Sequence, residues 1–226
     1  LHNGVDPVSG RKVGLETGDP RGFGNYDELY AAFMKQIRYF VDMKVRVSNY
    51  IDRMFAKYAP ATFLSLFIDD CIAKGRDYYN CGPRYNTTYI QCTGLGTITD
   101  SLVTLKKHIF EDKRWSMDEL LKAMADNFEG AEAMRQTILN RTPFFGNDDE
   151  YADSIAVKVF DDLYDTIEGK PNTKGECFHL NMLSTTCHVY FGKVMGATPN
   201  GRLAGRAISD GTSPSHGADT HGPSAV

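Results

Sequence analysis

The stretch Cys81-Gly82-Pro83-Arg84-Tyr85-Asn86-Thr87-Thr88-Tyr89-Ile90-Gln91-Cys92-Thr93-Gly94-Leu95-Gly96 decides how this chain is interpreted. It combines an arginine, an amide-rich turn, aromatic side chains and two closely spaced glycines, and the run continues to Leu102. The two glycines are not a dinucleotide loop, because position 99 is Thr where that motif needs a third glycine. They predict close packing of the backbone beside a turn. A helix is expected to begin within the run.

Two further segments follow in a set order. The first is Thr185-Thr186-Cys187-His188-Val189-Tyr190-Phe191-Gly192, followed by Met195-Gly196-Ala197-Thr198-Pro199-Asn200-Gly201-Arg202. The second runs from Ser213-Pro214 through Gly217-Ala218-Asp219-Thr220 to Gly222-Pro223. Together with residues 81–102, these segments resemble the glycyl radical enzymes of the pyruvate formate-lyase type. Within that family they are most similar to the branch that dehydrates trans-4-hydroxy-L-proline, and the resemblance covers essentially the whole chain.

The resemblance implies an α/β fold, while periodicity alone indicates only a mixed, helix-rich chain. Members of the family have a ten-stranded α/β barrel made of two five-stranded halves. Residues 1–226 would be one partial barrel domain, a helix-rich part that supplies mostly the second half.

The family needs two radical-bearing elements: a catalytic cysteine, typically in Cys-Val-Glu, and a glycine in an Arg-Val-x-Gly-Tyr-like loop. No cysteine of this chain is followed by Val-Glu, and no glycine has the Arg-Val-x setting. We therefore expect an internal fragment that lies after the cysteine loop and before the glycine loop and is inactive alone. No catalytic residue, bound cofactor or metal ligand is expected within it.

For the whole protein the resemblance implies a carbon–oxygen lyase that eliminates water from trans-4-hydroxy-L-proline. Its cofactor would be a glycyl radical on a segment absent from this chain. The implied partners are the small-molecule substrate, a radical-SAM activating enzyme and a second copy in a homodimer.

Two alternatives remain open. One is a glycerol or diol dehydratase of the same family, although those branches favour Tyr-Asn-x-Thr-Gly-Pro-Gln over residues 85–91 of this chain. The other is a non-catalytic paralogue or assembly subunit that keeps the barrel segment.

Composition and charge exclude several classes of partner. A net charge of −4 gives no basic face for nucleic acid. No apolar run approaches the roughly 18 residues of a membrane span. The five cysteines form no Cys-x-x-Cys pair, so reduced thiols in a cytoplasmic protein are expected rather than zinc or a disulfide framework.

Helical periodicity and end signals predict most of the elements. A loop is expected over residues 1–25, and helices over 27–58, 61–74, 131–140 and 149–168. Gly75 should end the second helix, and Thr99 or Asp100 should cap another that runs to about Phe110. Ser116 and Glu119 form a capping box for a helix that continues through Phe128. Extended structure with a polar interruption at 184–188 is predicted over 176–191, and loops are predicted from 192 onward.

The candidate substrate-binding residues are Thr185 and, second to it, Thr186. The resemblance implies that a threonine of the matching loop reaches the substrate. The competing interpretation is a threonine bonded only to nearby backbone. His188 could carry a proton, but a structural histidine is favoured, and structural roles are also expected for Arg84 and Arg202.

Overall fold

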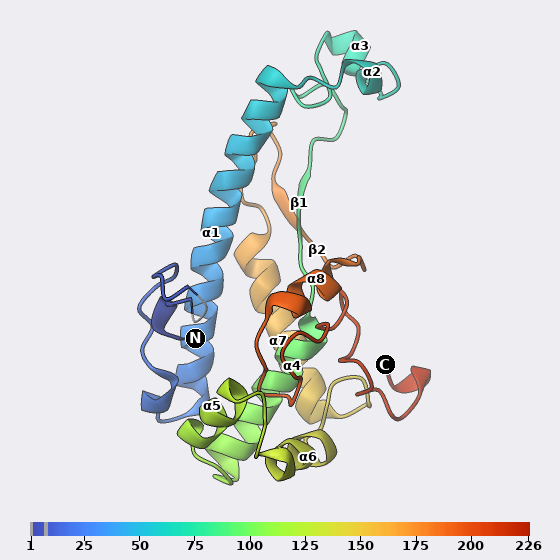
Figure 1. Cartoon of the computed structure of the whole chain (residues 1–226). Helices are drawn as coiled ribbons and strands as arrows, with labels where there is room; N and C mark the ends of the chain where they lie inside the picture. Colours follow the sequence, from blue (N-terminus) through green and yellow to red (C-terminus); the bar gives the residue numbers. More distant parts are fainter. Residues whose placement is uncertain (1, 7–8) are drawn as a thin grey trace. The chain divides into compact units, whose positions relative to one another are not determined.

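The computed structural model describes residues 2–6 and 9–226, which group into two compact units (Figure 1). The first unit comprises Leu1–Met34, Gln91–Asp162 and Met182–Val226. The second comprises Lys35–Ile90 and Leu163–Asn181. Two long helices, α1 (Tyr26–Tyr58) and α7 (Glu150–Ile167), contribute residues to both units. Both helices match their predicted ranges closely.

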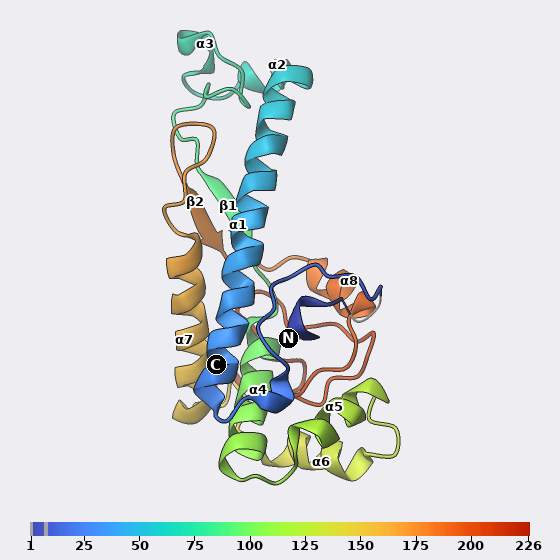
Figure 2. The same cartoon turned by 90° about the vertical axis from the view of Figure 1, so that its left-hand side faces the viewer.

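Helix α4 (Leu95–Thr104) is the centre of the first unit, and nine of its ten residues are buried. A seven-residue π-helix, Leu105–Glu111, continues it. Helices α5 (Met117–Ala125) and α6 (Glu132–Arg141) lie beside its lower end in both views (Figures 1 and 2). The core around α5 and α6 consists of Leu120, Ala123, Phe128, Ile138, Phe144 and Ala218, and Leu105 and Ile109 of the π-helix pack against it.

The start of α4 differs from the prediction. Thr99 and Asp100 do not cap the helix but lie buried inside it, and the helix begins at Leu95 after Gly94, whose φ is 88°. Gly96 lies in the first turn. A side chain has no room there, because a Cβ would be 2.5 Å from the Ser213 carbonyl oxygen. The glycines therefore serve close packing, as predicted, and this tertiary contact rather than a capping residue places the helix start.

The end of α5 is also earlier than predicted. The capping box forms as expected, since Glu119 N donates to Ser116 Oγ over 3.2 Å and Ser116 N donates to Glu119 Oε2 over 2.7 Å. The helix stops at Ala125, and positive φ angles at Asn127 and Phe128 turn the chain. That turn buries the Phe128 ring, which is 2% exposed, so core packing ends the helix.

The second unit contains the two-stranded sheet, formed by β1 (Thr88–Gln91) and β2 (Phe178–Asn181). The strands run parallel and lie side by side in both views (Figures 1 and 2). Thr88 N donates to the Cys177 carbonyl oxygen over 3.1 Å at the start of the pairing. Asn172 reinforces this junction, because its Nδ2 donates to the Asn86 carbonyl oxygen and to Thr88 Oγ1.

The predicted helix over 61–74 is broken into α2 (Thr62–Ser65) and α3 (Cys71–Lys74). Asp70 interrupts it with a φ of 73°, and the Ser65 hydroxyl donates to Asp77 Oδ2 over 2.9 Å and accepts from Tyr78 N over 2.8 Å. Such local side-chain bonds compete with helix formation. Gly75, with a φ of 60°, ends α3 as predicted.

Two stretches predicted without helices contain some. Residues 2–6 and 9–25, predicted as loop, include the short 3-10 turns His2–Gly4 and Pro20–Gly22, and residues 1, 7 and 8 of that prediction lie outside the described part. Residues 187–191, predicted as extended, belong instead to α8 (Cys187–Val194). Beyond α8 the chain is loop, as expected, up to a 3-10 turn at Pro223–Ala225. Among the described helices, none has the length and apolar character that crossing a bilayer requires.

Candidate functional site

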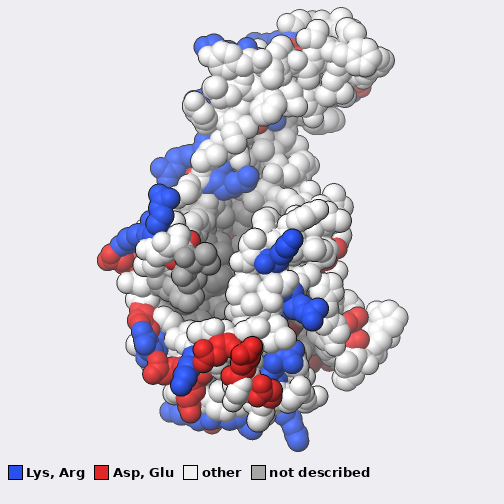
Figure 3. All heavy atoms as spheres, in the orientation of Figure 1, with Lys and Arg blue, Asp and Glu red and all other residues white. Residues whose placement is uncertain are grey.

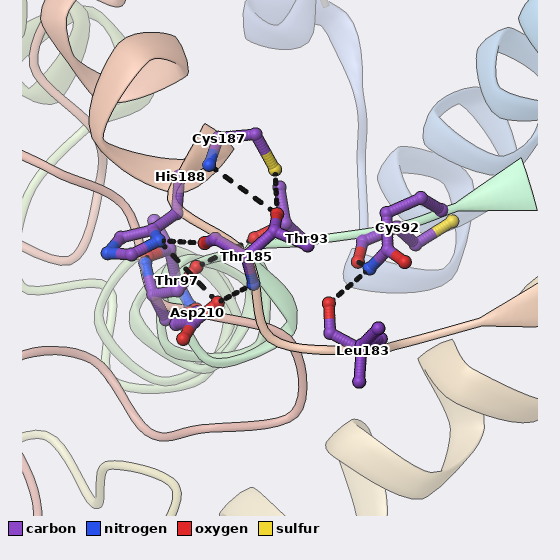
Figure 4. A network of polar contacts seen from close by, with 10 residues as sticks. Cys92, Thr93, Thr97, Leu183, Thr185, Cys187, His188 and Asp210 are labelled. Carbon is purple, nitrogen blue, oxygen red and sulfur yellow. Dashed lines mark hydrogen bonds and ion pairs between the residues drawn. The ribbon is translucent and has the colours of Figure 1, made fainter.

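The segments that follow the two parallel strands meet in the first unit. β1 ends at Gln91 and is followed by Cys92–Gly94, and β2 is followed by Met182–Thr186. Gln91 Nε2 joins them by donating to the Leu183 carbonyl oxygen over 2.5 Å. Ligand sites of α/β folds commonly lie beyond the carboxyl ends of parallel strands. Figure 4 shows the polar network built on these two segments.

A third segment, Ile208–Gly211, completes the network. The backbone N of Thr97 donates to Ser209 Oγ over 3.0 Å, and Ser209 N donates to Thr97 Oγ1 over 2.8 Å. Thr93 Oγ1 donates to the Ser209 carbonyl oxygen over 3.2 Å. Gly211 lets the segment approach the strand end, because a Cβ there would be 2.5 Å from the Met182 carbonyl oxygen. These reciprocal bonds fix the site on the rigid helix α4.

His188 and Asp210 hold the segment that contains the candidate threonines. The Nδ1 atom of His188 is 2.6 Å from the Thr185 carbonyl oxygen and 3.5 Å from Asp210 Oδ1 (Figure 4). Since a carbonyl oxygen only accepts, Nδ1 carries a proton and donates it. Asp210 Oδ1 also accepts from the backbone N of Thr185 over 3.2 Å. His188 therefore fixes the loop, as the favoured interpretation held, and leaves Nε2 as an acceptor in its neutral form.

Thr185 and Thr186 lie on the exposed surface rather than between two strands. The Thr185 hydroxyl is 2.7 Å from Cys187 Sγ and accepts from Cys187 N over 3.5 Å. Thr186 is the residue before α8 and makes no side-chain cap. The local turn that Thr185 and His188 form explains why the apolar run after it is helical, despite the strand preference of Val189, Tyr190 and Phe191.

An open cavity of about 1320 Å³ lies in the same unit. Thr97 is shared between its lining and the network, whereas Thr185 and Thr186 are absent from the lining. Polar side chains dominate it, among them Arg135, Asn147, Asn200, Arg206, Ser215 and His216. Its volume exceeds the roughly 300–1000 Å³ typical of a small-ligand pocket. The cavity and the threonine loop are therefore separate features.

The two candidate arginines have structural contacts. Arg84 pairs with Asp70 at 3.0 Å and with Asp69 at 3.6 Å. Arg202 donates to backbone oxygens of Gly196, Leu203 and Arg206 and to Thr198 Oγ1, and its partial burial lowers its pKa. Both arginines hold loops together, which is the role expected from the sequence.

Sequence reasoning missed Asp210 and Asp100. Asp210 lies in a short polar segment with no periodicity, so no local signal marks it. Asp100 is fully buried in α4, where Phe145 N donates to its Oδ1 over 2.9 Å. Burial raises the pKa of Asp100 to about 7, while bonds from Ser215 and Phe145 oppose the rise. Within the described residues, no three His, Cys, Asp or Glu side chains are gathered to share a metal ion.

Comparison with known proteins identifies the family to which this fold belongs. A family described as pyruvate formate lyase-like matches residues 1–192. The chain belongs to this family, and its α/β fold is a helix-rich part of the corresponding barrel.

Among particular relatives, the chain is 50% identical over 226 residues to trans-4-hydroxy-L-proline dehydratase of Clostridioides difficile, covering 100% of the chain and 29% of that protein. It is 38% identical over 219 residues to isethionate sulfite-lyase of Oleidesulfovibrio alaskensis, covering 95% of the chain and 26% of that protein. The chain thus spans less than a third of these relatives.

Solved structures of dehydratases also superpose on this chain. The crystal structure of the Clostridioides difficile hydroxyproline dehydratase with trans-4-hydroxy-L-proline bound superposes with a TM-score of 0.95, covering 100% of this chain and 29% of that one. The glycerol-bound glycerol dehydratase of Clostridium butyricum superposes with a TM-score of 0.92 at 33% identity, covering 99% and 28%.

Proposed function

We propose that the protein to which these residues belong is a glycyl radical dehydratase that eliminates water from trans-4-hydroxy-L-proline. The observation that carries the proposal is the 50% identity, over the whole chain, to a dehydratase solved with that substrate bound. The glycerol dehydratase is 33% identical to this chain, and a glycerol or diol dehydratase is the alternative within the family.

The radical chemistry belongs to segments outside these 226 residues. No cysteine here is followed by Val-Glu, and no glycine has the Arg-Val-x setting. The glycyl radical, formed by a radical-SAM activating enzyme, supplies hydrogen abstraction from a substrate carbon. The residues of this chain contribute binding and orientation, which hold a substrate within reacting distance and exclude water. The working form is proposed to be a cytoplasmic homodimer.

Thr185 and Thr186 are proposed to bind the substrate. Their loop directly follows β2, and the His188 and Asp210 contacts fix its backbone. Their hydroxyls are exposed and can donate to a carboxylate or hydroxyl oxygen. Losing a hydrogen bond to a charged group costs about 1.5–3 kcal/mol, which lowers kcat/KM by about ten- to a hundredfold.

The activity test uses the full-length protein, its activating enzyme, a reductant and S-adenosylmethionine under anaerobic conditions. We expect turnover of trans-4-hydroxy-L-proline to a pyrroline carboxylate, with little or no turnover of glycerol and propane-1,2-diol. If EPR detects a glycyl radical and the protein turns over glycerol in preference, glycerol replaces trans-4-hydroxy-L-proline as the substrate. A protein that accepts no radical would support the non-catalytic alternative.

The site test compares Thr185→Ala and Thr186→Ala with Thr137→Ala, a control at a half-buried threonine of α6 whose hydroxyl donates to the Ala133 carbonyl oxygen. We expect normal radical yield in all three and depressed hydroxyproline turnover in Thr185→Ala. An effect limited to Thr186→Ala would move the assignment by one residue. Equal kcat/KM in all three variants would show that the loop is structural.

A further inference from the structure

Three side chains of the second unit form a nucleophile–base–carboxylate chain. The Sγ atom of Cys177 is 3.5 Å from His179 Nε2. The other ring nitrogen, Nδ1, is in direct contact with Glu168 Oε1. The side chains of His179 and Glu168 are 31% and 26% exposed, and Cys177 is half-buried. This group is independent of the threonine loop and of the radical chemistry.

The local fold explains why these residues meet. Successive residues of a strand face opposite sides, so Cys177 and His179 share one face while Phe178, which is fully buried, faces the other. Glu168 directly follows α7, and the turn after it brings the chain back through a bridge between Pro171 and Cys177. Two bonds close that turn: Phe178 N donates to the Lys170 carbonyl oxygen over 2.7 Å, and Gly169 N donates to the Phe178 carbonyl oxygen over 3.1 Å.

The contacts fix the tautomer of His179. An ionised Glu168 only accepts, so Nδ1 carries the proton and Nε2 presents its lone pair to the thiol. The thiol proton can then move to Nε2, and the imidazolium that forms stays paired with Glu168. A base within reach of a thiol can take its proton as the sulfur attacks, which activates the sulfur as a nucleophile.

The two neighbouring lysines pair with aspartates rather than with Glu168. Lys170 and Lys174, on the same turn, pair with Asp42 at 2.7 Å and Asp52 at 3.8 Å. The centroids of the Tyr89 and His179 rings are 5.9 Å apart. The remaining cysteines differ in setting: Cys71 is 2% exposed, and burial raises the pKa of Cys92.

We propose that Cys177 is a modification site whose thiol, activated by His179 and Glu168, exchanges with low-molecular-weight disulfides such as oxidised glutathione. In this step the thiolate sulfur attacks one sulfur of the disulfide and forms the Cys177 mixed disulfide. The disulfide bond breaks, and the second sulfur leaves as a thiolate that takes the proton from His179. Cys177 is oxidised, and one half of the disulfide is reduced and released as a thiol.

The experiment exposes the full-length, non-activated protein to oxidised glutathione and follows each cysteine by peptide mass spectrometry. We expect Cys177 to react about tenfold faster than half-buried Cys81 near neutral pH. His179→Gln should slow Cys177 by about tenfold, and Glu168→Gln by a smaller factor. His216→Gln, a matched change elsewhere, should leave the rate unchanged.

Equal rates at Cys177 and Cys81 would overturn the proposal, and so would an unchanged Cys177 rate in folded His179→Gln.

Discussion

Helix α4 and the segment that holds α2 and α3 contrast in where polar and apolar side chains lie. Helix α4 buries five polar side chains: Thr97, Thr99, Asp100, Ser101 and Thr104. The α2–α3 segment exposes large apolar ones, including Phe63 at 75%, Phe67 at 70% and Ile72 at 70%. Figure 3 shows the surface of this segment as mostly uncharged. Composition therefore does not decide burial in this chain, because the partners available to each side chain, inside α4 and beyond it, do.

The partners of α4 are specific. Ser101 Oγ donates to the Thr97 carbonyl oxygen, Thr104 Oγ1 donates to that of Asp100, and Phe145 N satisfies Asp100 Oδ1. Buried polar groups cost little when they are paired in this way. In the α2–α3 segment the Phe63 and Phe67 rings lie edge to face, with their centroids 5.1 Å apart, but both remain exposed to solvent.

The largest expected change in stability comes from Gly96, where the Ser213–Ser215 backbone packs closely against α4. Gly96→Ala should destabilise the full-length protein by about 4 kcal/mol, since its Cβ would meet backbone atoms of Ser213 and Ser215 that cannot yield cheaply. Gly196→Ala, which has open space at that position, is the matched control. Urea unfolding midpoints measure both, and equal midpoints would contradict the packing.

A pair of leucines tests the contrast directly. Leu102 is 2% exposed in α4, and Leu66, just after α2, is 57% exposed. Leu102→Ala should cost about 3 kcal/mol of unfolding free energy through lost burial and a cavity. Leu66→Ala should change the stability of the isolated chain by less than about 0.5 kcal/mol. If Leu66→Ala costs as much in the full-length protein, other residues cover this face there.

Asp100 gives a smaller, pH-dependent effect. Its folded pKa, about 7, lies above the ordinary value of 3.8, so the folded state holds the proton more tightly. Stability from this group is therefore present below about pH 4 and declines as pH rises towards 7.

Asp100→Asn keeps an acceptor for Phe145 N but cannot ionise. Relative to the wild type, Asp100→Asn should be more stabilising at about pH 8 than at about pH 5, by roughly 2–3 kcal/mol, because only the wild-type carboxyl loses its proton over that range. Urea midpoints at the two pH values measure the difference. Asp100→Ala, which removes the acceptor, should be destabilising at both. A pH-independent difference between wild type and Asp100→Asn would show that the carboxyl is not buried as described.

The exposed rings should affect solubility more than stability. In the isolated chain, Phe63→Ser with Phe67→Ser should lower light scattering at high concentration, because apolar patches promote association. The change in unfolding free energy should stay within about 0.5 kcal/mol. An unchanged solubility limit in the double variant would assign the aggregation to another surface, such as the edges of β1 and β2.

The sequence determined the elements whose signals are local. The α1 range, the Ser116–Glu119 capping box and the stop at Gly75 depend on neighbours within a few residues, and each was predicted. Short-range periodicity and capping carry this information whatever the rest of the chain does. The family itself was also readable, because residues 81–102, 185–202 and 213–223 keep their order and composition.

Only the tertiary structure decided the features that depend on distant partners. The start of α4 is fixed by the Ser213–Ser215 backbone, and α8 replaces the predicted strand because His188 and Thr185 close a turn that Asp210 holds. Likewise, Glu168 reaches His179 only because the turn after α7 folds back onto β2. The contacts of Gly96 with Ser213 and of Thr185 with Asp210 join residues far apart in the chain, and their energies exceed the few tenths of a kcal/mol by which local propensities differ.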